Sequence, residues 1–172
     1  MKILLADQVV KRLQTELMRA GAKEIGGLLM GEDVGDGAFR VVGISVQRSG
    51  GTHTCFVRNP KEHQAYLEEF FARTGQDYTR FNYLGEWHSH PSFEPLPSAT
   101  DIKTMQSIVG DPEVGVNFLA LLVVRQVKRR IEATATVFMR TGTPVSIPVS
   151  PESEGSNKGW RISKWLRQVF NP

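Results

Sequence analysis

The sequence of 172 residues contains a single cysteine, Cys55, and no long hydrophobic run. A lone cysteine excludes an intrachain disulfide and a zinc site built from several cysteines, so any bound metal must use histidine and carboxylate ligands. The longest uninterrupted apolar stretch, Phe118 to Val124, is much shorter than the about 20 residues of a membrane-spanning helix. The apolar stretch near the amino end, Ile3 to Ala6, is too short for the core of a signal peptide. We therefore expect a cytoplasmic protein without a membrane span.

Charge is nearly balanced over most of the chain. The formal net charge is +3, of which +2 falls in residues 151–172, so residues 1–150 carry only +1. A short basic cluster at Arg125 and residues 128–130 has no interleaved aromatic residues of the kind that stack on bases, and we interpret it as a solvated hairpin turn. The hydrophobic content of 40% is enough to form a core. These features favour a globular protein with no nucleic-acid partner.

Hydrophobic periodicity predicts a mixed sheet flanked by helices. Apolar residues with a helical period follow Asp7, which we expect to cap a helix that ends at Gly21. Pro60 and Ser98 are placed to begin two further helices. Five apolar segments are typical of strands, the first two joined as a hairpin: Ile25–Met30, Phe39–Val46, Phe81–Trp87, Phe118–Val124 and Ile131–Met139. The pattern indicates a single α/β (α+β) domain over residues 1–150.

The last residues, 151–172, are predicted to be a linker and a tail helix. The stretch 150–159 is rich in Ser, Pro, Glu, Gly and Asn, which is typical of a linker. The apolar residues after it share one face of an amphipathic helix: Ile162, Trp165, Leu166, Val169 and Phe170. This helix could bind a membrane surface, a partner protein or its own domain. We favour the last two, because four basic residues make a weak membrane anchor.

The stretch from His88 to Asp101 carries residues suited to metal chemistry. One residue separates His88 from His90, so in an extended strand both imidazoles point to the same side and can reach one ion. Asp101 falls in the first turn of the helix that Ser98 caps, and a return of the chain would bring its carboxylate to that ion. Three such ligands leave a fourth position for water, as in catalytic zinc sites. A nearby carboxylate must take the proton of this water, and Glu24 is our candidate.

Each of these residues also has an ordinary explanation. An isolated histidine is usually a solvated side chain, Ser98 is a common type of helix cap, and Asp101 could be only its partner in a capping box. Four fixed residue types at these spacings would nevertheless coincide by chance in on the order of one sequence in a thousand. The joint pattern is therefore specific although its parts are not.

This pattern resembles the JAMM, or MPN-plus, metallopeptidases. Their motif is a glutamate in an early strand, then H-x-H, seven residues and S-x-x-D, and Glu24, His88, His90, Ser98 and Asp101 fill every position. The resemblance implies a curved mixed sheet flanked by helices, with layering like that of cytidine deaminases. It also implies one zinc ion (Zn2+) per chain, held by His88, His90 and Asp101. Glu24 would act as general base and then acid, and Ser98 would stabilise the oxyanion of the tetrahedral intermediate.

The residues around the first ligand resemble one bacterial branch of this family. The run from Leu84 to Pro91 reads L-G-E-W-H-S-H-P, and the run from Phe56 to Gln64 is also similar to that branch. Its members are stand-alone proteins encoded beside ubiquitin-activating-like (E1-like) and ubiquitin-conjugating-like (E2-like) enzymes, and some belong to antiphage systems of the CBASS type. The resemblance implies a zinc isopeptidase that releases a ubiquitin-like modifier, or a signalling protein conjugated through its carboxy terminus, from a target amine. The E1-like and E2-like enzymes of the same operon are candidate partners.

Two other functions remain as alternatives. Some MPN proteins are scaffolds that bind conjugates without cleaving them, and a DNA-repair-associated JAMM relative has a similar pattern of H-P-S and P-x-P-S-x-x-D. The complete set of ligands argues against the first, and the nearly neutral body argues against the second. Zinc deaminases share a related sheet, but their H-x-E and P-C-x-x-C signatures are absent from the sequence.

Four other residues receive weaker interpretations. His63 is expected to be a surface or outer-shell side chain. Glu86 shares a strand side with His88, where it could orient a ligand, contact the substrate or pack against a partner. Cys55 is interpreted as a small buried residue rather than a nucleophile, and His53 receives no role.

Overall fold

Nine strands, three α-helices and one short 3-10 helix occur in residues 1–52, 56–153 and 160–162, which the computed structural model describes. In chain order they are β1 (Lys2–Leu5), α1 (Asp7–Ala20), β2 (Gly26–Asp33), β3 (Ala38–Ile44), the 3-10 helix (Pro60–Glu62), α2 (Gln64–Arg73), β4 (Phe81–Ser89), α3 (Ala99–Gly110), β5 (Phe118–Val127), β6 (Arg130–Met139), β7 (Val145–Ile147), β8 (Val149–Pro151) and β9 (Trp160–Ile162). None of the described helices is long and apolar enough to cross a membrane. The interpretations of His53 and Cys55 concern residues outside the described ranges.

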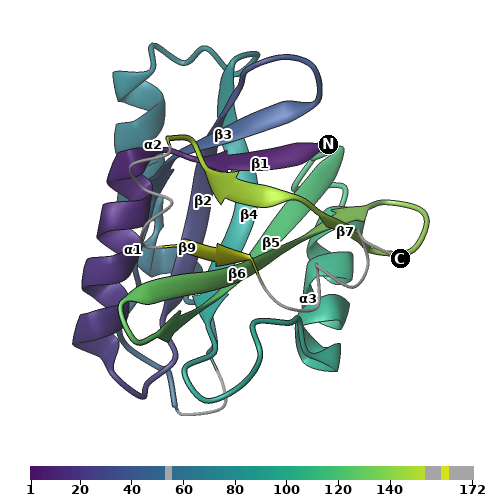
Figure 1. Cartoon of the computed structure of the whole chain (residues 1–172). Helices are drawn as coiled ribbons and strands as arrows, with labels where there is room; N and C mark the ends of the chain where they lie inside the picture. The colour runs from purple at the N-terminus through teal and green to yellow at the C-terminus, as the bar shows by residue number, and fades with distance from the viewer. Residues whose placement is uncertain (53–55, 154–159, 163–172) are drawn as a thin grey trace.

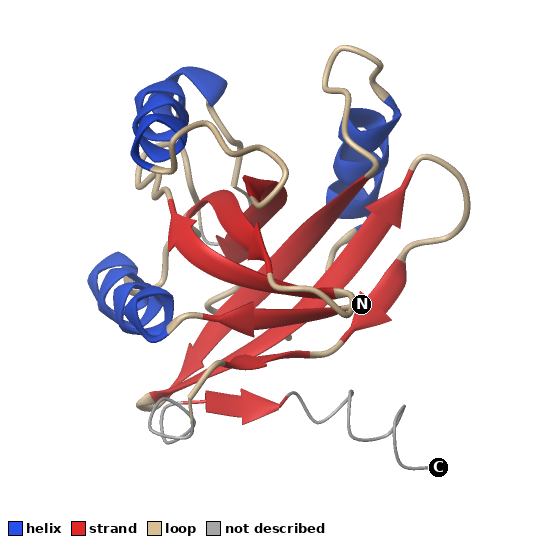
Figure 2. Cartoon of the chain, turned by 90° about the horizontal axis from the view of Figure 1, so that it is seen from above, coloured by secondary structure: helices blue, strands red, loops and turns tan. Residues whose placement is uncertain are grey.

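The strands form one mixed sheet, which Figures 1 and 2 show to be strongly curved. Its order is β7-β6-β5-β4-β2-β3-β1-β8, and β9 pairs with β6 outside this series. β4 runs parallel to β5, β1 to β3 and β8, and β9 to β6, whereas the other neighbours are antiparallel. The predicted mixed sheet, with β2 and β3 as a hairpin, is confirmed.

Helices cover both faces of the central strands. In β5, the even-numbered residues from 120 to 124 join the core that contains α1, and the odd-numbered residues from 119 to 123 join the core that contains α3. On β2, residues 28 and 30 pack with α2. Because a strand buried on both faces needs an apolar side chain at every position, this arrangement explains the uninterrupted apolar run in β5.

Helix α1 begins differently from the prediction. Asp7 is the first residue of the helix rather than its cap, and the N-cap is Ala6. The Asp7 carboxylate lies in the first turn, where the helix dipole favours a negative charge, and it accepts a hydrogen bond from Ser153 Oγ at 2.7 Å. Gly21 ends the helix as predicted, with φ of 60° in the left-handed region that favours glycine.

The amphipathic helix predicted for the tail is wrong over its first residues. Trp160–Ile162 form strand β9, and the rest of the predicted helix lies outside the described residues. β7 pairs with residues 135–137 of β6 and leaves residues 131–133 for β9. Trp160 is 7% exposed and belongs to the core that contains α1, so the strand buries its indole. The predicted boundary between the domain and its tail, at residue 150, falls within strand β8.

Candidate metal centre

The pairing of β2 with β4 brings the acidic and basic residues of the site together. The two strands are antiparallel, and Ile25, just before β2, continues the ladder. Its N–H donates to Ser89 Oγ at 3.0 Å, and its carbonyl accepts from the Ser89 N–H at 2.8 Å. Glu24 and His90 are the residues next to this pair, beyond the paired ends of the two strands. Glu24, two residues before β2, therefore borders the same cavity as the histidines at the end of β4.

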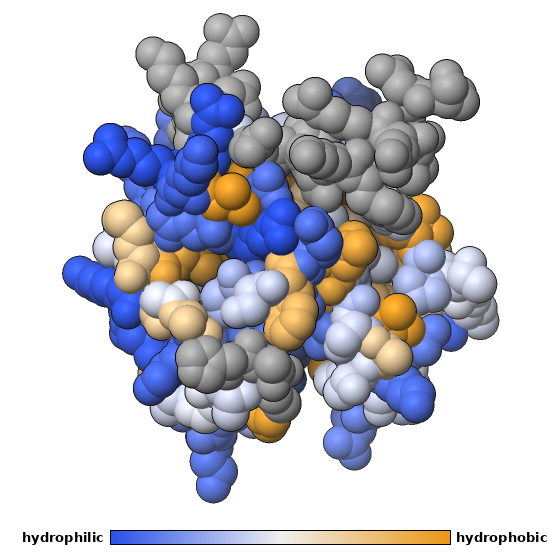
Figure 3. Space-filling view, turned by 60° about the horizontal axis from the view of Figure 1, so that its bottom comes forward, coloured by the Kyte–Doolittle hydropathy of each residue, from blue (hydrophilic) through white to orange (hydrophobic). Residues whose placement is uncertain are grey.

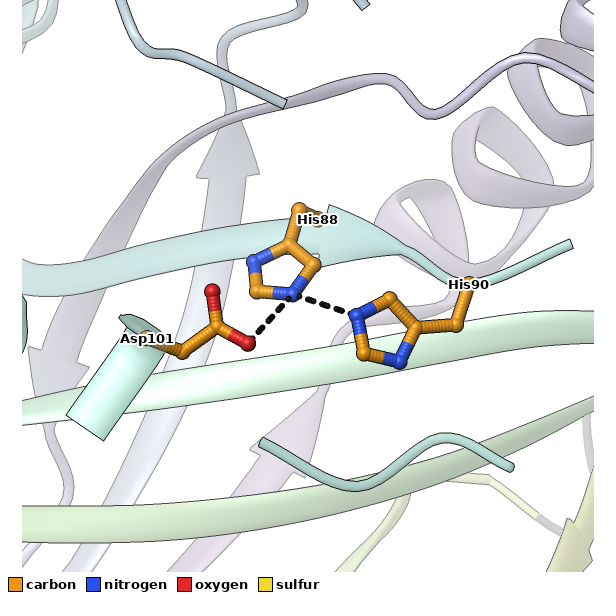
Figure 4. A group of neighbouring side chains, drawn as sticks. All are labelled: His88, His90 and Asp101. Atoms are coloured by element: carbon orange, nitrogen blue, oxygen red, sulfur yellow. Dashed lines mark hydrogen bonds and ion pairs between the residues drawn. The ribbon is translucent and has the colours of Figure 1, made fainter. Parts of the chain in front are cut away.

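Asp101 reaches the same place from helix α3. Ser98 is the N-cap of this helix and forms a capping box with Asp101. Ser98 Oγ accepts from the Asp101 N–H at 3.1 Å, and Asp101 Oδ2 accepts from the Ser98 N–H at 2.6 Å. The capping box turns the carboxylate back toward the start of the helix, where Oδ2 lies 3.5 Å from His88 Nε2 (Figure 4). A carboxylate has lone pairs for both a cap and a metal, so the two roles are compatible.

His88, His90 and Asp101 form a cluster that fits a metal ion. Their ligand atoms all lie within 4.8 Å of one another, and the Nε2 atoms of the two histidines are 3.0 Å apart. Figure 4 shows the three side chains pointing toward one another. Two ligands at about 2.0–2.1 Å from a tetrahedral ion lie about 3.3 Å apart, which is close to the separations from His88 to its two neighbours. The donor set suits zinc, and it also suits other ions that bind nitrogen and oxygen.

The protonation of the cluster also suits ligation. His90 Nδ1 lies 3.1 Å from the Glu94 carbonyl oxygen, which can only accept, so the neutral ring carries its proton on Nδ1 and leaves Nε2 for a metal. Burial lowers the pKa of His90, although the Glu94 hydrogen bond opposes this shift. Burial would raise the pKa of Asp101, but hydrogen bonds from His88 and Ser98 and the charge of His88 hold it well below its usual range. The cluster thus offers an imidazole at His90 whose neutral form leaves Nε2 for a metal, and an ionised carboxylate at Asp101.

Glu24 shares the cavity of the cluster without belonging to it. Its side chain is buried, and it lines a cavity of about 490 Å³ together with the three cluster residues. Burial raises the pKa of Glu24, the charge of His88 opposes the rise, and the charge of Asp101 adds to it. A buried carboxylate with a raised pKa beside a metal site is suited to proton transfer.

The cavity has further lining residues that the sequence did not single out. Figure 3 turns this face of the molecule forward and shows it hollowed, with hydrophobic side chains beside the hollow. The additional lining residues are Phe56, Phe93, Glu94, Leu96 and Thr100, and Ser98 lines the cavity with them. Phe56 begins the run from Phe56 to Gln64, which is similar to one bacterial branch of the family. This similarity is the signal by which the sequence could have identified Phe56 as a site residue. Most of the others lie between His90 and Ser98, where the motif specifies only a length.

Glu86 pairs with an arginine instead of joining the cluster. Its Oε1 lies 2.5 Å from Arg58 Nε. Both residues line a second cavity of about 230 Å³, which shares Phe56 and His88 with the first. Glu86 and His88 therefore border the same space, as strand alternation predicts.

His63 is buried, so of its two interpretations the surface residue is wrong and the outer-shell side chain stays a prediction. It is 1% exposed, with Nδ1 2.8 Å from Ser45 Oγ and Nε2 3.2 Å from Gln47 Oε1. Gln47 in turn accepts from the Asn59 N–H at 2.7 Å and donates to the Val57 carbonyl at 2.9 Å. His63 thus supports the segment that forms one side of the two cavities.

Comparison with known proteins identifies relatives along most of the chain. The model of the family described as prokaryotic homologs of the JAB domain matches residues 6–140. A CD-NTase/cGAS isopeptidase of Enterobacter hormaechei subsp. hoffmannii is 27% identical over 114 residues, 64% of this chain and 60% of that protein. A CD-NTase/cGAS isopeptidase of Vibrio cholerae serotype O1 is 35% identical over 101 residues, 58% of this chain and 62% of that protein. The chain therefore spans between 60% and 62% of the length of these two relatives.

A yeast relative and one solved structure extend the comparison. The ubiquitin carboxyl-terminal hydrolase RPN11 of Saccharomyces cerevisiae is 28% identical over 144 residues, 82% of this chain and 45% of that protein. The solution structure of protein DSY2949 from Desulfitobacterium hafniense matches with a TM-score of 0.65 at 19% identity, covering 88% of this chain and 94% of that one. The family match spans Glu24, both histidines and Asp101. The protein therefore belongs to the family of prokaryotic homologs of the JAB domain.

Proposed function

We propose that the protein is a zinc-dependent isopeptidase that hydrolyses the bond between the carboxy terminus of a conjugated protein and a target amine. The observation that carries this proposal is the cluster of His88, His90 and Asp101 with the buried Glu24 in one cavity. A hydrolase needs three metal ligands and a separate carboxylate for proton transfer, whereas a binding scaffold needs neither.

The proposed substrate is a conjugate of a CD-NTase/cGAS-like signalling enzyme or of a ubiquitin-like protein, in a bacterial antiphage system. Two relatives carry the name CD-NTase/cGAS isopeptidase, and a third is named a ubiquitin carboxyl-terminal hydrolase. These names support a hydrolase of protein conjugates. E1-like and E2-like enzymes that form the conjugate are the proposed partners.

Each residue of the site has a defined task in this reaction. His88, His90 and Asp101 would hold the zinc ion, which supplies a Lewis acid that polarises a carbonyl and acidifies water. Glu24 accepts a proton from the attacking water and passes it to the leaving amine, and its raised pKa brings this exchange closer to neutral pH. Ser98 Oγ accepts the Asp101 N–H, so the Ser98 hydroxyl proton is the group to donate to the developing oxyanion.

The decisive experiment compares the wild type with Glu24→Ala. Metal is counted by elemental analysis, and cleavage is measured on a reporter fused to the carboxy terminus of the CD-NTase-like enzyme or of a ubiquitin-like protein. We expect one zinc per chain in both proteins and cleavage by the wild type only, with a loss of about 10²-fold or more in the variant. Glu113→Ala, which removes an exposed glutamate after α3, should cleave like the wild type.

The other outcomes separate the parts of the proposal. Cleavage by Glu24→Ala at the normal rate would show that another group is the base. Zinc in both proteins without cleavage by either would favour the non-catalytic scaffold, and no metal in the wild type would contradict the ligand set.

A further inference from the structure

The loop that follows β4 carries a contact that orients one ligand of the cluster. His90 lies one residue past the end of β4, and its Nδ1 hydrogen bonds to the carbonyl of Glu94 in the loop. The position of this carbonyl sets the rotation of the imidazole and the direction of its Nε2 lone pair. The orientation of His90 in the cluster therefore depends on the contacts that hold this loop in place.

Arg125 of β5 holds this loop at two adjacent residues. Its Nη1 donates to the Phe93 carbonyl at 3.1 Å, and its Nη2 donates to Glu94 Oε1 at 3.2 Å. On its other side, Arg125 Nε donates to Glu132 Oε2 at 2.9 Å, which joins the guanidinium to β6. The planar fork of arginine makes all these bonds at once, which the single ammonium of lysine cannot do.

The burial of Arg125 sets it apart from the rest of the basic cluster. Its side chain is 22% exposed, whereas residues 128–130 at the hairpin turn are exposed. The interpretation of the whole cluster as a solvated turn is therefore wrong for Arg125. The Glu94 side chain is 64% exposed, so this ion pair alone contributes little to stability. The bonds to the Phe93 carbonyl and to the buried Glu132 carry most of the attachment.

We infer that Arg125 is a positioning residue of the metal centre, which fixes the Glu94 carbonyl and through it the His90 ring. This inference rests on the proposed zinc site. A backbone carbonyl cannot be removed by substitution, so Arg125 is the side chain through which this contact can be tested. Thr134 of β6 is a second attachment of the same loop, since its hydroxyl donates to the Pro95 carbonyl.

The test measures zinc affinity by competition with a chromophoric chelator, and the thermal midpoint of each metal-free protein. Partners behind a metal ligand typically contribute about 10–100-fold in affinity, and we expect Arg125→Gln to weaken zinc binding by about tenfold. Arg125→Lys keeps the charge without the fork and should resemble Arg125→Gln. Arg129→Gln removes an exposed charge from the same hairpin and should bind zinc like the wild type.

The possible results distinguish the inference from the proposed zinc site. Wild-type affinity in Arg125→Gln, or full recovery in Arg125→Lys, would overturn the positioning role. A lowered thermal midpoint with unchanged zinc affinity would also overturn it, because Arg125 would then be only structural. If Arg125→Gln fails to fold, Arg125→Lys carries the test, and wild-type zinc affinity in it would overturn the positioning role. A wild type that binds no zinc would contradict the metal site itself.

Discussion

At the scale of the residue, one hydroxyl group serves both the helix and the proposed reaction. Ser98 Oγ caps α3 through the Asp101 N–H, and Ser98 lines the cavity. We expect Ser98→Ala to lower the free energy of unfolding by about 1 kcal/mol through loss of the cap. It should also lower kcat by about 10²–10³-fold through loss of the oxyanion donor. Ser98→Thr keeps the hydroxyl and should retain both properties in urea unfolding and cleavage assays. A less stable Ser98→Ala that cleaves normally would contradict the oxyanion role.

His63 makes the stability of the metal-free protein depend on pH. Burial lowers its pKa, the charge of Arg58 lowers it further, and the charge of Glu62 opposes the shift. The folded-state pKa therefore lies below the unfolded value of about 6.5, so the unfolded chain binds the proton more readily. Stability should be complete above about pH 6.5 and should fall as the pH drops from there toward the folded-state pKa.

The variant His63→Gln removes this titration. Its free energy of unfolding, measured in urea, should change less than that of the wild type between about pH 7.5 and about pH 5.5. His90, whose pKa is also lowered, titrates in both proteins, so the comparison isolates His63. The same pH dependence in both proteins would show that His63 does not contribute.

Residues of the site could be predicted from the sequence where chemistry fixes both their type and their spacing. His88, His90 and Asp101 meet this condition, and the structure brings these three side chains together. No fixed spacing ties Glu24 to them, and its role as the base stays a prediction. Arg125 does not meet the condition, because it contacts Phe93 from 32 positions away and Glu132 across a hairpin. Such contacts depend on which strands become neighbours, and no local pattern records that.

At the scale of the element, β2 lies too close to its neighbours to accept a side chain at Gly26. A Cβ there would lie 2.5 Å from the Trp87 carbonyl oxygen and 2.6 Å from the Phe56 ring. We expect Gly26→Ala to cost about 1–3 kcal/mol in unfolding free energy. It should also impair cleavage, because Glu24 lies only two residues before Gly26 and would move with it.

The matched control is Gly110→Ala at the end of α3. A Cβ at Gly110 would meet nothing within 4 Å, and alanine favours the helix by about 0.5–1 kcal/mol. Guanidinium unfolding of both variants should therefore give changes of opposite sign. A Gly26→Ala protein as stable as the wild type would contradict the close approach of β2 and β4.

Long elements could be predicted from periodicity, and short ones could not. Strands β2 to β6 run for seven residues or more, so their apolar patterns are visible in the sequence. β1, β7, β8 and β9 have three or four residues, which is too few to show a period. Pairing fixes their places, of β1 with β3 and β8, and of β7 and β9 with β6. The helix predicted for the tail is wrong over residues 160–162, because the burial of Trp160 in strand β9 beside β6 outweighs the helical spacing of the apolar residues there.

At the scale of the whole molecule, the candidate site lies where three elements meet at one end of the curved sheet. Glu24 comes from just before β2, the histidines from the end of β4, and Asp101 from the start of α3. Helices cover the two faces of the central strands (Figure 1). Polar side chains that must meet a substrate therefore lie at the ends of the strands and helices. A metal ion held here would join α3 to the sheet.

Zinc should therefore stabilise the folded protein as a whole. At a free zinc concentration about 100 times Kd, binding to the folded state alone adds about 2.7 kcal/mol to the free energy of unfolding. Glu24→Ala keeps all three ligands and should show the same rise in thermal midpoint on adding zinc, reversed by EDTA. Asp101→Asn keeps an oxygen to cap α3 but loses the charged ligand, so its rise should be much smaller. A full rise in Asp101→Asn would exclude Asp101 as a ligand, and a lost rise in Glu24→Ala would make Glu24 a ligand rather than the base.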